Sequence, residues 1–440
     1  MNRKLSFLFF ILTIAFIQLG AKEIEFTEYD LDNGLHVILH QDNSTPIVAI
    51  SIMYHVGSKN EDPERTGFAH FFEHLMFEGS ENIDRGQYFK IIQGNGGTLN
   101  ANTSFDRTYY YEILPSNQLE LGMWLESERL MHAKIDSEGV ETQRKVVKEE
   151  RSQRYDNQPY GSLLEETFKR AYTKHPYHWV PIGSVQYIDK ASIDEFRDFY
   201  NVFYVPQNAT LVIAGDIDID QAKEYIDKYF SGIPKGTHEI YRPDIEEDYL
   251  PGEVRDTVYD NIQLPAIIES YKIPSQKSDD YYAINMLTTL LSGGKSSRMY
   301  KELVDKQQLA LQASSSPLSL EDPGQFIVLG ICNAGVEPDS LEDAMQVEIN
   351  KVKNELIGEE EFQKLQNQIE SELVQDNSTV AGIAGSLATY HVLFGNTNLV
   401  NTELEKYMEV TREDIKRVAN QYLNENSRVV LYYLPKSQEK

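Results

Sequence analysis

Apolar and polar residues alternate along the first segments after residue 22, a pattern typical of β-strands with one buried face. Residues 23–31 and 35–40 alternate on either side of Asn33-Gly34, the strongest short signal for a β-hairpin. A third apolar run covers residues 47–55. We therefore expect these three strands to follow one another as an antiparallel meander.

The period of the pattern changes after residue 67. Residues 68–77 carry apolar side chains at helical spacing, and residues 97–114 predict two paired strands around a Ser-Phe-Asp turn. Longer amphipathic segments predict helices over residues 116–132, 138–155 and 190–203. A strongly apolar strand at residues 208–217 ends this half of the chain.

A segment rich in proline, glycine and charge, residues 232–255, predicts a linker. The order of elements then restarts, with strands expected at residues 265–273, 309–318, 324–334 and 427–435. The two halves also end alike, since Tyr-Val-Pro-Gln-Asn at 204–208 and Tyr-Leu-Asn-Glu-Asn at 422–426 each precede a strand.

This repetition predicts an α+β protein of two tandem homologous domains related by duplication. Each domain is expected to be an antiparallel-rich sheet covered by helices on one face. We place the N-terminal domain at residues 22–231, the linker at 232–255 and the C-terminal domain at 256–440.

The first 21 residues have the composition of a secretory signal peptide. A short basic start precedes an apolar run from Leu5 to Leu19, and the small residues Gly20 and Ala21 suit cleavage. The run is shorter than the roughly 20 residues that a membrane span needs, although an uncleaved anchor is the alternative. We therefore expect no stable membrane anchor in the mature chain and a bacterial periplasmic location, ahead of an extracellular one.

The charge balance limits the possible partners. Asp and Glu outnumber Lys and Arg by 69 to 41, which argues against nucleic acid and anionic membrane surfaces. Cys332 is the one cysteine of the chain, so no intrachain disulfide can form. Packing alone must stabilise this exported protein.

The sequence His70-Phe-Phe-Glu73-His74 is the clearest chemical motif. On a helix, His70 and His74 lie one turn apart on one face, so both imidazoles can reach a single zinc ion. Glu73 lies beside them and can act on water at that ion. A catalytic zinc site needs a third protein ligand as well as an open position.

The predicted helix at residues 138–155 supplies a candidate for that ligand. Val146 and Val147 mark its expected buried stripe, which positions 143, 150 and 154 extend. Glu150 therefore lies on the buried stripe, whereas Glu149 is turned about 100° away. A carboxylate on an apolar face is costly unless it is paired or binds a metal.

With Glu150 placed 76 residues after His74, the motif resembles the inverted zinc motif of the pitrilysin/insulinase family of metallopeptidases. Further segments along the whole mature chain are similar to that family: Val56-Gly57-Ser58 with Glu61, Gly67-Phe-Ala-His70, Gly96-Gly97-Thr-Leu-Asn100-Ala101, Gly293-Gly294 with Ser296-Ser297-Arg298, and Leu309-Ala310. Two repeats rather than four are typical of the half-size members that work as dimers, which include mitochondrial processing peptidase and bacterial peptidases.

The resemblance implies a zinc-dependent endopeptidase acting on peptides or unfolded polypeptides, with one zinc ion per chain. His70, His74 and Glu150 would bind the metal, and Glu73 would be the general base for the zinc-bound water. Asn100 and Ala101 would lie on an edge strand to which an extended peptide adds.

Two positions depart from the family pattern. Where the family usually has a second glutamate, seven residues before Glu150, this chain has Gln143, which can still hydrogen-bond near the site. Active members also have an arginine and, seven residues later, a tyrosine, which polarise the substrate carbonyl. Those positions here are Val304 and Leu311, which can donate no hydrogen bond.

We therefore expect a heterodimer in which this chain carries metal and base and a homologous partner supplies the Arg/Tyr pair. A self-sufficient homodimer is the nearest alternative, and a non-catalytic structural or peptide-binding subunit is a further one. No ligand spacing includes His175 or His178, and His55 lies at a strand end before Val-Gly-Ser, so we interpret these three histidines as structural.

Overall fold

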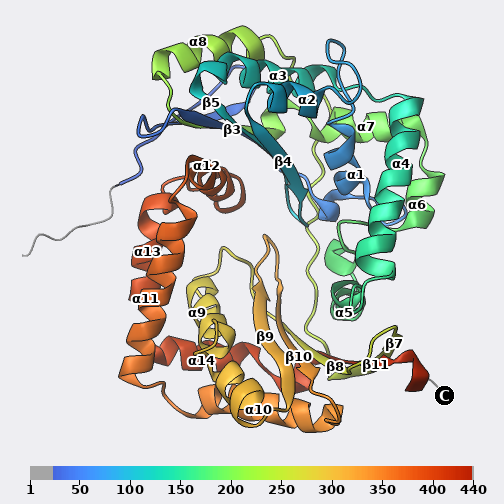
Figure 1. Cartoon of the computed structure of the whole chain (residues 1–440), viewed down its shortest axis with the longest axis vertical. Coiled ribbons are helices and arrows are strands. Elements are labelled where there is room, and N and C mark those ends of the chain that lie inside the picture. Colours follow the sequence, from blue (N-terminus) through green and yellow to red (C-terminus); the bar gives the residue numbers. More distant parts are fainter. Residues whose placement is uncertain (1–22, 439–440) are drawn as a thin grey trace, which may run out of the picture.

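The computed structural model describes residues 23–438 and contains two β-sheets, each with its own set of helices (Figure 1). The predicted signal peptide at residues 1–21 lies outside the described residues. In the described part, no helix has both the length and the apolar character needed to cross a membrane.

The first sheet has the strand order β1-β2-β6-β3-β5-β4. Its strands are β1 (Thr27–Asp30), β2 (His36–Gln41), β3 (Ile47–Tyr54), β4 (Thr98–Thr103), β5 (Thr108–Pro115) and β6 (Ala209–Gly215). The predicted hairpin at Asn33-Gly34 is present, because β1 and β2 pair antiparallel and Gly34 has the left-handed φ of +87° that the turn requires.

The expected meander of the first three strands is wrong. Strand β6 lies between β2 and β3, parallel to β2 and antiparallel to β3. All of its residues are buried. A strand that is apolar on both faces is stable at the centre of a sheet, where helices cover both sides, and its insertion separates β2 from β3.

The second sheet has the order β7-β11-β8-β10-β9. Its strands are β7 (Val254–Asp260), β8 (Ala266–Lys272), β9 (Ala310–Leu318), β10 (Gln325–Cys332) and β11 (Arg428–Pro435). This order repeats β2-β6-β3-β5-β4 strand for strand. In the first sheet, β6 is parallel to β2 and antiparallel to β3. In the second sheet, β11 is likewise parallel to β7 and antiparallel to β8. The predicted duplication and the α+β fold are therefore confirmed.

The helices of the first half are α1 (Phe68–Leu75), α2 (Tyr88–Gly94), α3 (Leu119–His132), α4 (Ser137–Arg151), α5 (Leu163–Ala171), α6 (Val185–Lys190), α7 (Ile193–Phe203) and α8 (Ile219–Phe230). Those of the second half are α9 (Tyr281–Ser292), α10 (Pro338–Asn354), α11 (Glu359–Asp376), α12 (Val380–Thr389), α13 (Leu399–Glu409) and α14 (Arg412–Tyr422). Helices of the same half cover one face of each sheet (Figure 1).

Each half also places a helix on the sheet of the other half. Helix α12 packs on β3 and β6, and α5 packs on β8 and β11. Ile383 and Leu387 of α12 share an apolar cluster with Ala49 and Val212 of the first sheet. The two halves are therefore joined by packing as well as by the chain.

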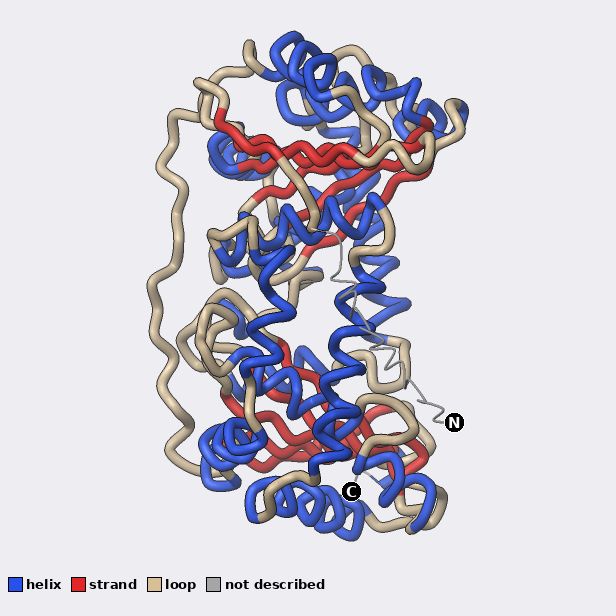
Figure 2. Tube along the Cα trace, turned by 90° about the vertical axis from the view of Figure 1, so that its left-hand side faces the viewer, coloured by secondary structure: helices blue, strands red, loops and turns tan. Residues whose placement is uncertain are grey.

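Residues 231–253 contain no helix or strand. This segment overlaps the predicted linker and runs as a long loop from one sheet to the other (Figure 2). Strand β7 begins at Val254, so it includes the last two residues of the predicted linker at 232–255. The exact domain boundaries stay a prediction.

Candidate active site

Helix α1 carries the His70-Phe-Phe-Glu73-His74 sequence, the metal motif, and two residues determine where the helix begins. Gly67 precedes the helix with φ +99°, and a Cβ there would lie 2.9 Å from the carbonyl oxygen of Ile182. The buried carboxylate of Glu61 accepts hydrogen bonds from the backbone N–H groups of Gly67 and Ala69, both at 2.8 Å. Such a carboxylate satisfies N–H groups that have no partner within the helix.

The rotation of α1 follows from its aromatic face. Phe68, Phe71 and Phe72 are buried in the core of the first domain. Positions 70 and 74 then lie on another face, toward α4, which packs against α1.

The structure brings together His70, His74 and Glu150, the three residues expected to bind the metal. Glu150 Oε2 lies 3.1 Å from His74 Nε2 and 3.5 Å from His70 Nε2. One ligand atom from each of the three residues lies within 4.8 Å of the other two. The imidazole rings are nearly perpendicular, at 74°. Glu150 enters the site from α4, where the buried Val147 is one turn away.

This arrangement fits a metal ion. Ligand atoms about 2.1 Å from a tetrahedral zinc ion are separated by about 3.4 Å, and the two Nε2–Oε2 distances in the structure lie on either side of this value. Burial and the neighbouring His74 lower the pKa of His70 to about 4, so its imidazole is neutral at pH 7 and can offer a lone pair. The hydrogen bond from His74 lowers the pKa of Glu150, which favours a carboxylate ligand. His70 Nδ1 is buried and has no hydrogen-bond partner among the described residues.

Glu73 lies on the same helix and is held by a contact that sequence reasoning did not find. Thr103 Oγ1, at the end of β4, donates a hydrogen bond of 2.7 Å to Glu73 Oε2. Burial raises the pKa of Glu73, which suits a group that accepts a proton near neutral pH. Side chains alternate between the two faces of a strand, so Thr103 lies on the same face as Ala101. This alternation along residues 98–103 was the signal in the sequence from which Thr103 could have been found.

Gln143 lies seven residues before Glu150 on α4 and contacts an acidic side chain, and its role near the site stays a prediction. Its amide donates to Glu78, and the other oxygen of Glu78 accepts from Arg85. Arg154 lies 2.8 Å from Glu150 Oε1, the oxygen that faces away from the histidines. Sequence reasoning missed Glu78 and Arg85, although Glu78 follows the motif closely.

The predicted buried stripe of α4 is only partly correct. Val147 is fully buried, but Val146 is 43% exposed. The carboxylate of Glu150 is largely covered, whereas Glu149 is exposed. The preference for Glu150 over Glu149 therefore agrees with the structure, while Val146 does not belong to the buried face.

Asn100 and Ala101 lie on β4, which is an edge strand of the first sheet. Asn100 is exposed and Ala101 is buried. The Ala101 N–H donates to Asn100 Oδ1 at 2.9 Å. The location suits an added peptide strand, and the role of both residues stays a prediction.

Val304 and Leu311 occupy different environments. Val304 packs against the core of the second domain, and the side chain of Leu311, on the edge strand β9, is 59% exposed. Neither side chain carries a polar atom.

The three histidines interpreted as structural have protein partners. His175 Nε2 lies 3.3 Å from Asp322, and His55 Nε2 lies 2.9 Å from Glu321. His178 Nδ1 lies 2.7 Å from a backbone carbonyl oxygen.

A second group, Glu28, His36 and His391, also brings possible ligand atoms together. Its two imidazoles are stacked, with centroids 3.5 Å apart and planes within 6°. Because the lone pairs lie in the ring planes, stacked imidazoles cannot both point at one ion. The perpendicular rings of His70 and His74 have no such restriction.

Comparison with known families gives two matches along the chain. Residues 36–178 match the model of "Insulinase (Peptidase family M16)", and residues 190–369 match "Peptidase M16 inactive domain". The first match contains the metal motif and Glu150. The second covers much of the half in which the sequence shows no such motif.

Individual relatives agree with this assignment. The zinc protease PqqE of Helicobacter pylori is 31% identical over 408 residues, which is 92% of each chain. A crystal structure of a protease from Helicobacter pylori superposes with a TM-score of 0.90 at 30% identity, covering 94% of this chain and 100% of that one. The periplasmic protease PqqL of Escherichia coli has the same fold at 17% identity, with a TM-score of 0.77 over 94% of this chain and 48% of PqqL.

The repeated sheet topology, the H-x-x-E-H helix and these matches agree over nearly the whole described chain. The protein therefore belongs to the pitrilysin/insulinase family, peptidase family M16, as a half-size member.

Proposed function

We propose that this chain is a zinc-dependent endopeptidase that hydrolyses peptides or unfolded polypeptides. The observation that carries this proposal is the convergence of His70, His74 and Glu150 beside a second carboxylate, Glu73. The name of the Helicobacter pylori relative, a zinc protease, supports the choice of metal.

The residues of the site would have two roles, metal binding and proton transfer. His70, His74 and Glu150 would hold one zinc ion, which would polarise a carbonyl and lower the pKa of water. Glu73 would take a proton from the attacking water and deliver it to the leaving amide nitrogen. The hydrogen bond from Thr103 orients the Glu73 carboxylate for both transfers.

The substrate is proposed to bind as an added strand along β4. Asn100 and Ala101 are the residues that we expect to exchange main-chain hydrogen bonds with it. Because a peptide must be extended to pair with an edge strand, this mode favours unfolded polypeptides over folded proteins.

We further propose that the chain acts as the metal-carrying subunit of a heterodimer. Val304 and Leu311 occupy the positions where active relatives are expected to have an arginine and a tyrosine, and neither can stabilise an oxyanion. The match to about half of PqqL supports pairing of two such units. A homodimer is the alternative.

PqqL of Escherichia coli, a periplasmic protease by name, supports the proposed periplasmic location. The composition of residues 1–21 favours export by a cleaved signal peptide.

A non-catalytic subunit of the same family is the second candidate. Residues 190–369 match a family model described as an inactive domain, and this description favours a non-catalytic subunit. Zinc content distinguishes the two candidates, since a non-catalytic subunit should purify without stoichiometric metal.

The deciding experiment is hydrolysis of a quenched peptide library by the mature chain alone, after zinc content has been measured. Glu73→Gln is the control, because it preserves the size of the side chain and removes the base. We expect this variant to retain zinc and to lose at least about a hundredfold in kcat.

Rapid turnover by the single chain would contradict the heterodimer but support the peptidase. A folded chain that binds zinc and turns over only with a partner would support both proposals. A folded chain that binds no zinc would contradict the peptidase and favour the non-catalytic subunit.

A further inference from the structure

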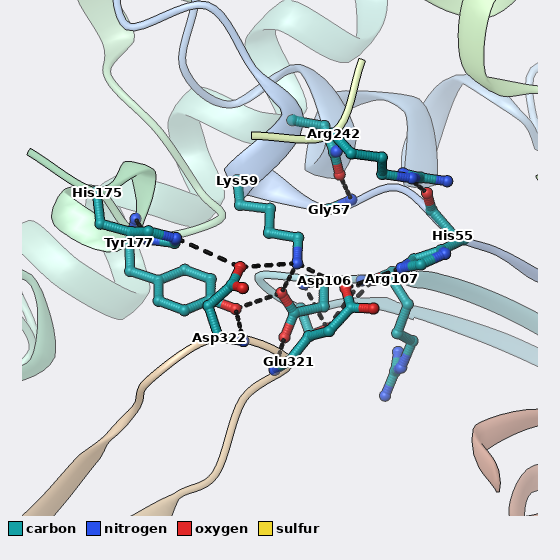
Figure 3. A network of polar contacts seen from close by, with 12 residues as sticks. His55, Gly57, Lys59, Asp106, Arg107, His175, Tyr177, Arg242, Glu321 and Asp322 are labelled. Carbon is teal, nitrogen blue, oxygen red and sulfur yellow. Dashed lines mark hydrogen bonds and ion pairs between the residues drawn. The ribbon is translucent and has the colours of Figure 1, made fainter. Parts of the chain in front are cut away.

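The turn between β9 and β10 contacts the first domain at a buried cation (Figure 3). The Lys59 side chain is 4% exposed, and its Nζ lies 2.6 Å from Glu321 and 3.1 Å from Asp322, both in this turn. The same Nζ lies 3.1 Å from Asp106, in the turn between β4 and β5. Since β9-β10 and β4-β5 are equivalent pairs in the two sheets, equivalent hairpin turns meet around one lysine.

Backbone groups fix the position of the acidic turn as well. The N–H of Glu321 donates to Asp106 Oδ2 at 3.0 Å, and the N–H of Asp322 donates to the Tyr177 hydroxyl at 3.1 Å. That hydroxyl donates to Asp106 Oδ1 at 2.6 Å. Such bonds specify where the turn lies, because a small displacement of the turn would leave partly buried donors without partners.

Two histidines of the first domain add to the contact. His55 Nε2 lies 2.9 Å from the same Glu321 oxygen that faces Lys59, and His175 Nε2 lies 3.3 Å from Asp322. Burial alone would lower the pKa of Lys59, but the surrounding carboxylates outweigh burial and raise it. The lysine is therefore charged, and its charge is matched by groups from both domains.

Another ion pair across the same interface differs in its surroundings. Arg170 of α5 pairs with Asp256 of β7 at 2.6 Å, and the Asp256 side chain is 51% exposed. An exposed pair contributes little to stability or geometry. Removing one partner from a buried cluster leaves an uncompensated charge and is much more costly.

The cluster is directly joined to the turn at residues 104–107. The N–H of Lys59 donates to the carbonyl of Phe105 at 3.0 Å, and the N–H of Ser58 donates to that of Ser104 at 3.3 Å. A Cβ on Gly57 would lie 2.4 Å from the carbonyl of Phe105, so the two backbones are in contact. This turn has no room to shift toward Gly57.

The turn follows β4 without an intervening residue. Thr103, the last residue of β4, donates the hydrogen bond to Glu73. A continuous path of contacts therefore leads from the acidic turn of the second domain, through Lys59 and Asp106, to the side chain that holds Glu73.

We propose that Glu321 and Asp322 of the second domain are positioning residues for the active site of the first. Through Lys59 and Asp106 they hold the β4–β5 turn, and thereby both the Thr103–Glu73 contact and the edge strand proposed to bind the peptide. The inference rests on the proposed function for its catalytic consequence, but the positioning itself can be measured separately.

The test compares Glu321→Ala/Asp322→Ala with Asp256→Ala in the full mature chain, loaded with zinc. Hydrogen exchange of the amides at residues 98–107 is the readout that needs no activity. We expect at least about tenfold faster exchange there in the double variant, with stoichiometric zinc retained. On a quenched peptide, kcat should fall about tenfold or more, because the base is less well held.

Asp256→Ala removes an interdomain ion pair that does not touch the β4–β5 turn, so it should change neither readout. Glu321→Gln keeps the size of the side chain and an acceptor for Lys59, and should recover most of kcat. If the double variant fails to fold, Glu321→Gln replaces it in the exchange measurement. We then expect exchange at residues 98–107 in Glu321→Gln to increase by an intermediate amount.

The inference is overturned if Glu321→Ala/Asp322→Ala lowers only the global stability and leaves exchange at residues 98–107 unchanged. It is also overturned if Asp256→Ala increases exchange at these residues as much as the double variant does. A wild-type chain without turnover, even with its partner, would contradict the proposed function alone. The exchange measurement would still decide whether the acidic turn positions β4.

Discussion

At the scale of single residues, Glu73, the proposed general base, depends on a neighbour from another element. The motif on α1 places Glu73 beside the two histidines, but its carboxylate is oriented by Thr103 at the end of β4. Without that donor, the carboxylate would be free to turn toward other partners. The hydroxyl of Thr103 therefore contributes to the proposed chemistry although the motif does not include it.

Replacing Thr103 by Val should slow catalysis without removing the metal. A hydrogen bond to a charged group contributes about 1.5–3 kcal/mol, so the loss of this bond should lower kcat by roughly tenfold or more. The check is kcat on a quenched peptide together with zinc content.

Thr103→Ser is the matched control, since it keeps the hydroxyl and should keep most of the activity. Equal rates for Thr103→Val and the wild type would show that the contact has no role in orienting Glu73.

At the scale of elements, α12 connects the two halves in a way that its own sequence does not reveal. The helix is apolar on nearly all sides, with Ile383, Ala384, Leu387 and Ala388 buried. Its neighbours are β3 and β6 of the first sheet, more than 160 residues earlier in the chain. A helix with so little polar surface requires such a covered position.

Leu387→Ala should therefore destabilise the whole chain. The side chain is fully buried, and truncation of such a leucine costs about 2–5 kcal/mol. Chemical denaturation followed by circular dichroism measures this change.

Val374→Ala on the neighbouring helix α11 is the comparison, because this side chain is 55% exposed and its truncation should change stability by no more than about 0.5 kcal/mol. A similarly small effect of Leu387→Ala would mean that α12 is not firmly packed on the first sheet.

At the scale of the whole molecule, the interface between the domains combines apolar packing with the Lys59 cluster. Burial raises the pKa of Glu321, but the hydrogen bond from His55 and the charges of His55 and Lys59 outweigh it, so the net pKa lies well below its ordinary value. A carboxyl with a lowered folded-state pKa stabilises the fold above its unfolded pKa, and this contribution is lost as the pH falls through the folded pKa.

We therefore expect stability to fall on acidification, starting below the unfolded-state pKa of about 4.3. Thermal unfolding between about pH 5 and pH 3, with chelator present in every sample so that metal release does not contribute, measures the slope. In Glu321→Gln the slope should be smaller, because this variant cannot titrate at position 321. Identical slopes would contradict a stabilising role for the Glu321 carboxylate.

Local features of the first half could be predicted because neighbouring residues decide them. The turn at Asn33-Gly34, the helix that begins at Phe68 and the strand pair β4-β5 all follow from periodicity and turn chemistry. The choice of Glu150 rested on helical spacing, and the structure places it beside both histidines. Val146 shows the limit of this reasoning, because an apolar residue at the edge of a stripe is buried only if a neighbouring element covers it.

The order of residues along the chain was enough to predict the two-fold repetition of strands and helices, the His70-Phe-Phe-Glu73-His74 helix and the choice of Glu150, but not Thr103, which holds Glu73. The predicted features depend on spacings of at most a few turns, or on a similarity that extends over the whole chain. Only the tertiary structure decided that β6 separates β2 from β3, that the halves exchange α5 and α12, and that Lys59 meets Glu321 from 262 residues away. The physical reason is that contacts between distant segments depend on how whole elements pack, and local periodicity carries no information about which element will cover which face.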